Sequence, residues 1–114
     1  MHTYLDTKTI IINSMKELNE SWISIDALQD IMIQIKDKLE QQGKLQDYHI
    51  WYVEDYYSII NSISFNNDIF EFNESSQNIF IRKKEMLAVL VENYPIDEII
   101  TKIIQDCINK KKRK

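Results

Sequence analysis

The residues that most often carry chemistry are few and scattered in this chain. The sequence has two histidines, His2 and His49, and neither has a second ligand at a spacing typical of a metal site. Asp47 and His49 would need a serine on a tight glycine turn to form a catalytic triad, and the sequence has no such turn. Cys107, the single cysteine, lies in an apolar stripe and is expected to be an inert buried thiol. The sequence therefore predicts no catalytic residue, no metal ligand and no cofactor, and we expect a protein that is not an enzyme.

An aromatic and acidic segment in the middle of the chain is the clearest candidate for binding. Tyr and Trp are common anchors of protein interfaces and can also stack on unpaired bases. Trp51 and Tyr52 are adjacent and cannot easily both face inward, so one of them is expected at the surface, whereas helical spacing predicts Tyr56 and Tyr57 in the core. The candidate protein-binding residues are Trp51, Tyr52, Glu54 and Asp55.

The charge of the chain is unevenly distributed. The net charge is −4. Residues 1–81 contain thirteen acidic and five basic side chains, a net charge of −8, and residues 82–114 contain nine basic and five acidic ones, a net charge of +4. An acidic body favours a partner with a basic surface, and it can mimic the phosphate charge of DNA.

Composition indicates one globular domain in a reducing compartment. A chain of 114 residues, 44% of them hydrophobic, can bury a core without disulfides or metal. A single cysteine allows no intrachain disulfide. The first residues do not resemble a signal peptide, and no apolar run approaches the length of a membrane span. We therefore expect a cytoplasmic protein that does not enter a membrane.

The first half of the chain is predicted to be mainly helical. A helix is expected to start after Asp6 or Thr7 and to end near Asn19, followed by a very short strand over residues 22–25. Residues 25–42 have one apolar face, with Ser24 as a plausible N-cap and Gly43 at the position of a left-handed C-terminal residue. Residues 45–52 fit either a strand or a lead into a third helix, which helical spacing places at about 53–64.

The second half combines a hairpin with two further helices. Residues 68–72 and 78–82 are rich in strand formers and flank a polar loop, which predicts a β-hairpin. Residues 86–91 form an apolar run that predicts a buried fourth helix, which Pro95 ends. An isoleucine-rich stripe over residues 96–108 predicts a fifth helix that packs on its own domain, and the alternative use of this stripe is a homodimer interface.

This order of elements resembles a winged helix-turn-helix domain over residues 7–84. The fold class we predict is α+β: a mostly helical, winged-helix-like domain with one β-hairpin and C-terminal helices. The domain is expected to cover residues 1–109, and residues 110–114 are expected to form a basic disordered tail. The resemblance implies a recognition helix at 53–64, a wing at 68–82, and dimerisation through terminal helices.

The same resemblance implies contacts to DNA from the third helix and the wing. The candidate nucleic-acid-binding residues are Ser58, Asn61, Ser62, Arg82, Lys83 and Lys84. The third helix opens with acidic residues and contains no Lys or Arg, so few phosphate contacts are available and weak DNA affinity is expected. For the basic cluster at 82–84, an ordinary solvated edge is the favoured interpretation.

Two functions follow from these patterns. The first is a small, acidic, non-enzymatic protein-binding module that engages a basic, nucleic-acid-binding surface. In general character such a chain resembles phage or mobile-element inhibitors and immunity proteins. The second is a dimeric winged-helix transcriptional regulator that binds DNA. A protein partner is expected first, DNA is the alternative, and a homodimer through residues 96–108 is compatible with both.

Overall fold

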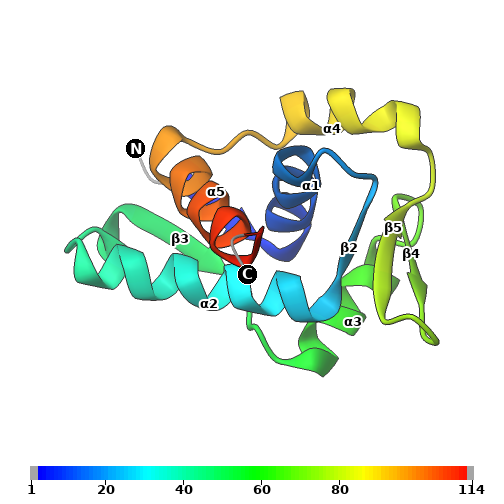
Figure 1. Ribbon diagram of the computed structural model, residues 1–114, viewed down its shortest axis with the longest axis horizontal. Helices are drawn as coiled ribbons and strands as arrows, with labels where there is room; N and C mark the ends of the chain where they lie inside the picture. Colours follow the sequence, from blue (N-terminus) through cyan, green and yellow to red (C-terminus); the bar gives the residue numbers. More distant parts are fainter. Residues whose placement is uncertain (1–2, 113–114) are drawn as a thin grey trace.

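The computed structural model of the chain describes residues 3–112 and shows an α+β fold that is mostly helical (Figure 1). The helices in this part of the chain are α1 (Thr7–Leu18), α2 (Ile25–Gln41), α3 (Tyr56–Phe65), α4 (Leu87–Asn93) and α5 (Glu98–Lys112). The strands are β1 (Thr3–Asp6), β2 (Trp22–Ser24), β3 (Tyr48–Trp51), β4 (Phe70–Asn73) and β5 (Asn78–Ile81). Two short 3₁₀ turns cover Leu45–Asp47 and Lys84–Met86. The predicted mixture of helices with one hairpin is confirmed.

A three-stranded antiparallel sheet has the strand order β2-β5-β4. Strands β4 and β5 form the predicted hairpin, with Phe70 opposite Ile81 and Asn73 opposite Asn78. The short strand predicted after the first helix is β2, and it pairs with β5 from Trp22 opposite Phe80 to Ser24 opposite Asn78. The sheet therefore joins a segment between α1 and α2 to the hairpin that follows α3.

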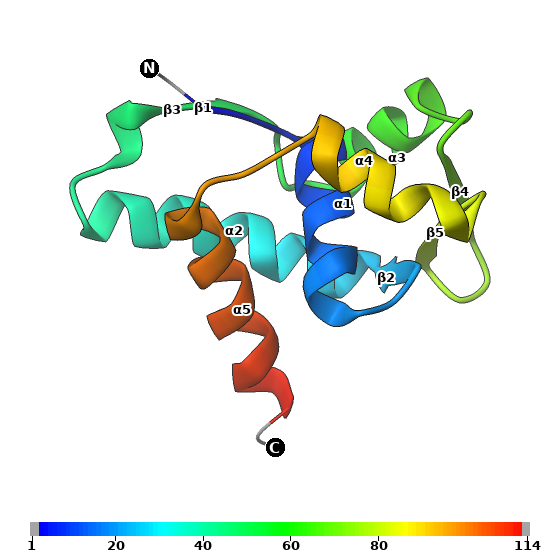
Figure 2. The same cartoon turned by 90° about the horizontal axis from the view of Figure 1, so that it is seen from above.

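A second, two-stranded sheet joins the start of the chain to the segment between α2 and α3. Strands β1 and β3 are parallel, and Tyr4 lies opposite His49 and Asp6 opposite Trp51. Figure 2 shows this pair running along the edge of the molecule, away from the three-stranded sheet. The structure thereby places residues 48–51 in a strand, where the sequence left strand and helix open. The partner strand β1 was not predicted.

Helix α1 lies at the centre of the core. Asp6 caps its start by accepting a hydrogen bond from the Thr9 backbone N–H at 2.8 Å, which agrees with the predicted start. Its apolar residues from Ile10 to Met15 are buried, and so are polar residues on its other faces, because α2, α3, α4 and α5 all contact it. Asn13 satisfies its side-chain amide by donating to the carbonyls of Thr9 and Tyr94, both at 2.8 Å.

Helices α2 and α5 pack against each other and against α1 (Figures 1 and 2). Ser24 caps α2 by accepting from the Ala27 N–H, and Gly43 follows the helix with a left-handed φ of 66°, as predicted. The predicted isoleucine stripe of α5 is buried in its own domain. The buried members are Ile100, Ile103, Ile104 and Ile108.

Three local predictions differ from the structure. Helix α3 starts at Tyr56, not 53, because Asp55 caps it and residues 53–55 are not helical. Helix α4 is not buried: Leu90 is its one buried residue, since the helix lies on the outside of α1 and shows its other faces to solvent. Cys107 is half-buried, not buried.

The C-terminal end of α5 also extends further than expected. The helix continues through Lys112, into the region predicted to be a disordered tail, and residues 113–114 lie outside the described part of the chain. Within residues 3–112, no helix is long and apolar enough to cross a membrane.

Candidate functional site

The outer face of the β1–β3 pair carries three stacked rings. Side chains alternate along a strand, so Leu5 and Tyr48 point into the core while Tyr4, His49 and Trp51 point outward. The Tyr4 ring lies 4.8 Å from His49 and 6.3 Å from Trp51, measured between ring centres, with interplanar angles of 18° and 12°. Tyr4 is 62% exposed and Trp51 is 65% exposed. We call Tyr4, His49 and Trp51 the ring face.

The strands beneath the ring face are held from the core side. Leu5 is completely buried. The Tyr48 hydroxyl donates to the Asp97 carboxylate at 2.6 Å, which ties β3 to the segment before α5. Burial and this hydrogen bond to a carboxylate both raise the pKa of Tyr48, so the phenol stays neutral. The rings therefore stand on a rigid support, and large aromatic side chains held in one orientation lose little entropy when a partner covers them.

Tyr52 lies on the opposite side from Trp51, so Trp51 is the surface residue expected from this pair, and Tyr52, a candidate binding residue, is not at the surface. It is buried, and its hydroxyl donates to the backbone carbonyl of Met32 at 2.7 Å. Burial raises the pKa of this phenol, with a further contribution from the negative charge of Glu54. Strand alternation continues one residue past β3, so Trp51 faces solvent and Tyr52 fills the core beside α2.

The two acidic residues predicted for protein binding have structural partners. Glu54 forms an ion pair with Lys36 of α2, with 2.7 Å between Oε2 and Nζ, and its backbone carbonyl accepts from Gln29. Asp55 caps α3 by accepting from the Ser58 backbone N–H at 3.1 Å. Hydrogen bonds from Ser58 hold the pKa of Asp55 below its usual value. Both carboxylates therefore help to position the segment that links β3 to α3.

Helix α3 presents an aromatic and neutral surface. Ile59 and Ile63 face the core, Asn61 is exposed, and Ser58 and Ser62 are half-buried. Tyr57 is 76% exposed, which corrects its predicted burial. Tyr56 is half-buried, and its ring is nearly perpendicular to the Tyr57 ring, with 5.5 Å between the ring centres. Phe65 is the last residue of the helix and is 90% exposed. Helix α3 therefore carries no Lys or Arg beside Ser58, Asn61 and Ser62, the three polar residues that were predicted to contact DNA.

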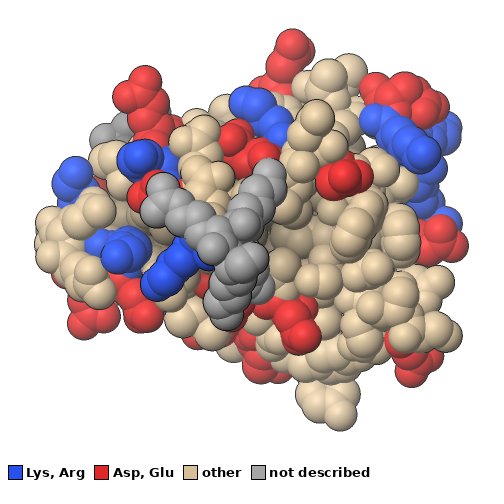
Figure 3. All heavy atoms as spheres, viewed as in Figure 1, with Lys and Arg blue, Asp and Glu red and all other residues tan. Residues whose placement is uncertain are grey.

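The basic cluster at 82–84 is exposed, and its members differ in their contacts. Arg82 donates from Nε to the Asn67 carbonyl and lies 3.8 Å from the Glu71 carboxylate. Lys83 and Lys84 are exposed at the turn into α4. In Figure 3 a group of Lys and Arg lies at upper right, over the segment between β5 and α4, with Asp and Glu beside it and scattered over the rest of this face, and further Lys and Arg lie at the left.

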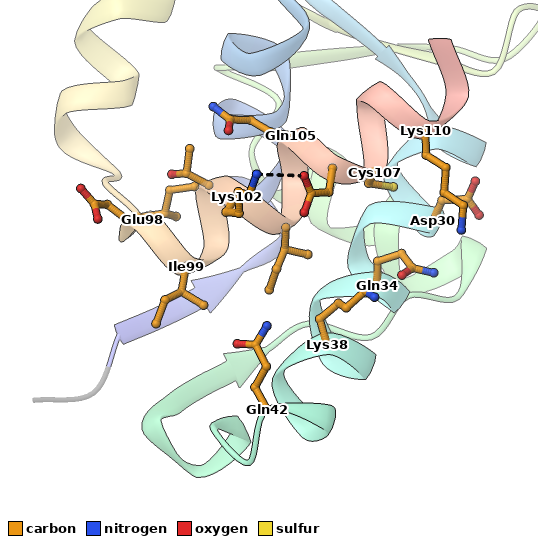
Figure 4. Close-up of a pocket in the computed structure, with 14 residues that line it drawn as sticks. Asp30, Gln34, Lys38, Gln42, Glu98, Ile99, Lys102, Gln105, Cys107 and Lys110 are labelled. Atoms are coloured by element: carbon orange, nitrogen blue, oxygen red, sulfur yellow. Dashed lines mark ion pairs between the residues drawn. The ribbon is translucent and has the colours of Figure 1, made fainter. Parts of the chain in front are cut away.

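A groove lies between α2 and α5. Its volume is about 1000 Å³, and Figure 4 shows the two helices that form its walls. Polar side chains from α2 face half-buried apolar ones and charged ones from α5. The residues that line it include Asp30, Gln34, Lys38, Gln42, Glu98, Ile99, Lys102, Ile103, Asp106, Cys107 and Lys110.

Two of these features were hidden in the sequence. The ring face needs β1, whose only signal is the alternation of Tyr4 and Leu5 between polar neighbours. The groove needs the crossing of α2 and α5, although the alternating charges of α5 are readable along the chain.

Among residues 3–112, no three His, Cys, Asp or Glu side chains are grouped as metal ligands. Comparison of the chain with models of protein families, with curated proteins and with solved structures found no match.

Proposed function

We propose that this chain is a non-enzymatic protein-binding module that engages its partner through the ring face. The observation that carries the proposal is the exposure of Tyr4 and Trp51, stacked in nearly parallel planes with His49 on a strand pair anchored in the core. Trp and Tyr are enriched among the residues that dominate binding energy at protein interfaces. A rigid, exposed group of such rings is typical of a binding surface.

Charge supports a partner with basic residues around the contact. Residues 1–81, which include the whole ring face, carry a net charge of −8. Asp6 lies opposite Trp51 in the strand register, on the same face of the pair. Complementary charge around an aromatic anchor mainly raises the association rate and the selectivity for one partner. An inhibitor or immunity-type protein that covers a nucleic-acid-binding surface would have this combination.

The test compares the ring face with an equally exposed aromatic residue elsewhere. Proteins retained by the immobilised chain from its source cells are identified, and the purified candidate is titrated with Trp51→Ala, Tyr4→Ala and the control Phe65→Ala by calorimetry. We expect Trp51→Ala to weaken binding by roughly 30-fold or more, as for an interface hot spot, and Phe65→Ala to have little effect. Equal affinity of Trp51→Ala and wild type would refute the proposal.

Glu54 and Asp55 are poorer probes of the same idea. Replacing Glu54 by Lys would break the ion pair with Lys36, and replacing Asp55 by Lys would remove the cap of α3, so either change would lower the stability of the fold. A loss of binding in these variants would then report on the link between β3 and α3 as well as on charge.

A second candidate function, DNA binding by a winged-helix domain, rests on a different observation. The strand order β2-β5-β4, with α2 and α3 between β2 and the hairpin, is compatible with that family's element order. The absence of Lys and Arg from α3 weighs against it. Fluorescence anisotropy with a labelled duplex, stepped from about 50 to 200 mM salt, tests it. Binding that depends steeply on salt, and that is weakened in the double variant Lys83→Ala and Lys84→Ala, would favour DNA binding. No binding at low salt would exclude this function.

A further inference from the structure

Helix α5 exposes a row of charges that alternate in sign. Glu98, Lys102, Asp106 and Lys110 follow one another at intervals of four residues, so they lie along one side of the helix. Lys102 and Asp106 are 3.4 Å apart between Nζ and Oδ1, as the dashed line in Figure 4 shows. All four residues line the groove between α2 and α5. We call them the charge row.

The charge row is complementary to itself in one orientation. If a second α5 lies antiparallel across a two-fold axis near Ile104, Lys102 faces the partner's Asp106 and Glu98 faces the partner's Lys110. Every facing pair then has opposite signs. A parallel arrangement would place each charge against its own copy, so like charges would meet throughout. A two-fold dimer requires a surface that complements itself, and an alternating row provides one.

The surroundings of the row suit a helix from a second copy. Ile99, Ile103 and Cys107 form the adjacent stripe at the same spacing and line the groove; Ile103 is buried and the other two are half-buried, so the stripe contributes apolar atoms to the groove. The other wall consists of Asp30, Gln34 and Lys38 of α2 and of Gln42 just after it, two charged and two uncharged side chains. Ile100 and Ile104 anchor α5 in the core from the opposite side. The helix is therefore a fixed platform.

We propose that the α2–α5 groove is the interface of a homodimer in which the two α5 helices pack antiparallel through their charge rows. The inference is independent of the ring face, which lies on the β1–β3 pair and remains open to another partner.

A charge-swap series tests this arrangement by sedimentation equilibrium over a wide range of protein concentrations. Wild type is expected to form a concentration-dependent dimer that raised salt weakens. Lys102→Glu alone and Asp106→Lys alone each create two like-charge contacts across the axis and should weaken the dimer by about tenfold or more. An equimolar mixture of these two variants, and the double variant with both changes, restore opposite charges and should recover association.

Two control variants leave the charge row intact. Asp37→Lys reverses an exposed charge on α2 that does not line the groove and should leave the dimer unchanged. Trp51→Ala should do the same, which separates this inference from the proposed function. Far-UV circular dichroism confirms that each variant is folded. A wild-type monomer at all concentrations, a dimer that ignores both single reversals, or a mixture that fails to recover association would each overturn the inference.

Discussion

The buried hydroxyl of Tyr52 gives a sharp test of how the segment after β3 is held. Its hydrogen bond to the Met32 carbonyl joins this segment to α2. Tyr52→Phe keeps the ring and removes one oxygen, so packing changes little. A neutral buried hydrogen bond contributes about 1 kcal/mol net. The Met32 carbonyl lies within α2 and keeps its helical partner, so we expect a loss of about 1 kcal/mol in the free energy of unfolding near neutral pH.

At high pH the same substitution should no longer destabilise the protein. In the unfolded chain the phenol ionises with a pKa of about 10, whereas burial raises the pKa of Tyr52 in the folded chain. The folded state holds the proton longer, so this contribution is complete below about pH 10 and is lost as pH rises toward the folded pKa. At about pH 11, ionisation of the unfolded phenol lowers the stability of wild type by about 1.4 kcal/mol, and phenylalanine has no such group.

The assay is urea unfolding of wild type and Tyr52→Phe at about pH 8 and pH 11, followed by circular dichroism. Near pH 8 we expect the variant midpoint to be lower by roughly 0.5–1 M urea. Near pH 11 the difference should vanish or change sign. Other titrating groups, including Tyr48, are present in both proteins and cancel in the comparison. A stability difference that stays constant between the two pH values would refute the burial of this hydroxyl.

Three further substitutions test the core and its caps. Ser14 is buried in α1, and its hydroxyl has no hydrogen-bond partner among the described residues; Ser14→Ala should therefore raise the free energy of urea unfolding by about 0.5–1 kcal/mol, and destabilisation would contradict this. Asp6→Ala removes the cap on the Thr9 N–H and should lower the melting temperature by roughly 3–6 °C, whereas an unchanged value would mean that the cap contributes nothing. Ile104→Ala empties a fully buried site under α5 and should cost about 3–4 kcal/mol in urea unfolding, and a cost below about 1 kcal/mol would show that α5 is not docked.

Local signals accounted for the elements that the sequence predicted well. Helix α2 has an apolar face at helical spacing, a serine at its start and a glycine after its end, and each of these acts within a few residues. The hairpin follows in the same way from two strand-forming runs around a polar loop. These predictions were confirmed because they need no knowledge of distant partners.

The elements that were missed depend on distant contacts. Strand β1 exists because β3 lies beside it, more than forty residues further along the chain, and four residues alone have no strong preference. The exposure of α4 depends on how much of α1 remains uncovered after α2, α3 and α5 have packed, which the residues of α4 do not reveal. The apolar run of α4 by itself therefore suggested a buried helix.

The sequence by itself determined the helices, the hairpin, the uneven charge and the alternating row on α5, because each is a matter of residue type and spacing. It also indicated that Trp51 and Tyr52 do not both face inward. Only the tertiary structure decided which of them faces solvent, that Tyr4 joins His49 and Trp51 in a stack, and that the charge row borders a groove. Those outcomes depend on the pairing of β1 with β3 and the crossing of α2 and α5, where burial of apolar surface between distant segments selects one arrangement.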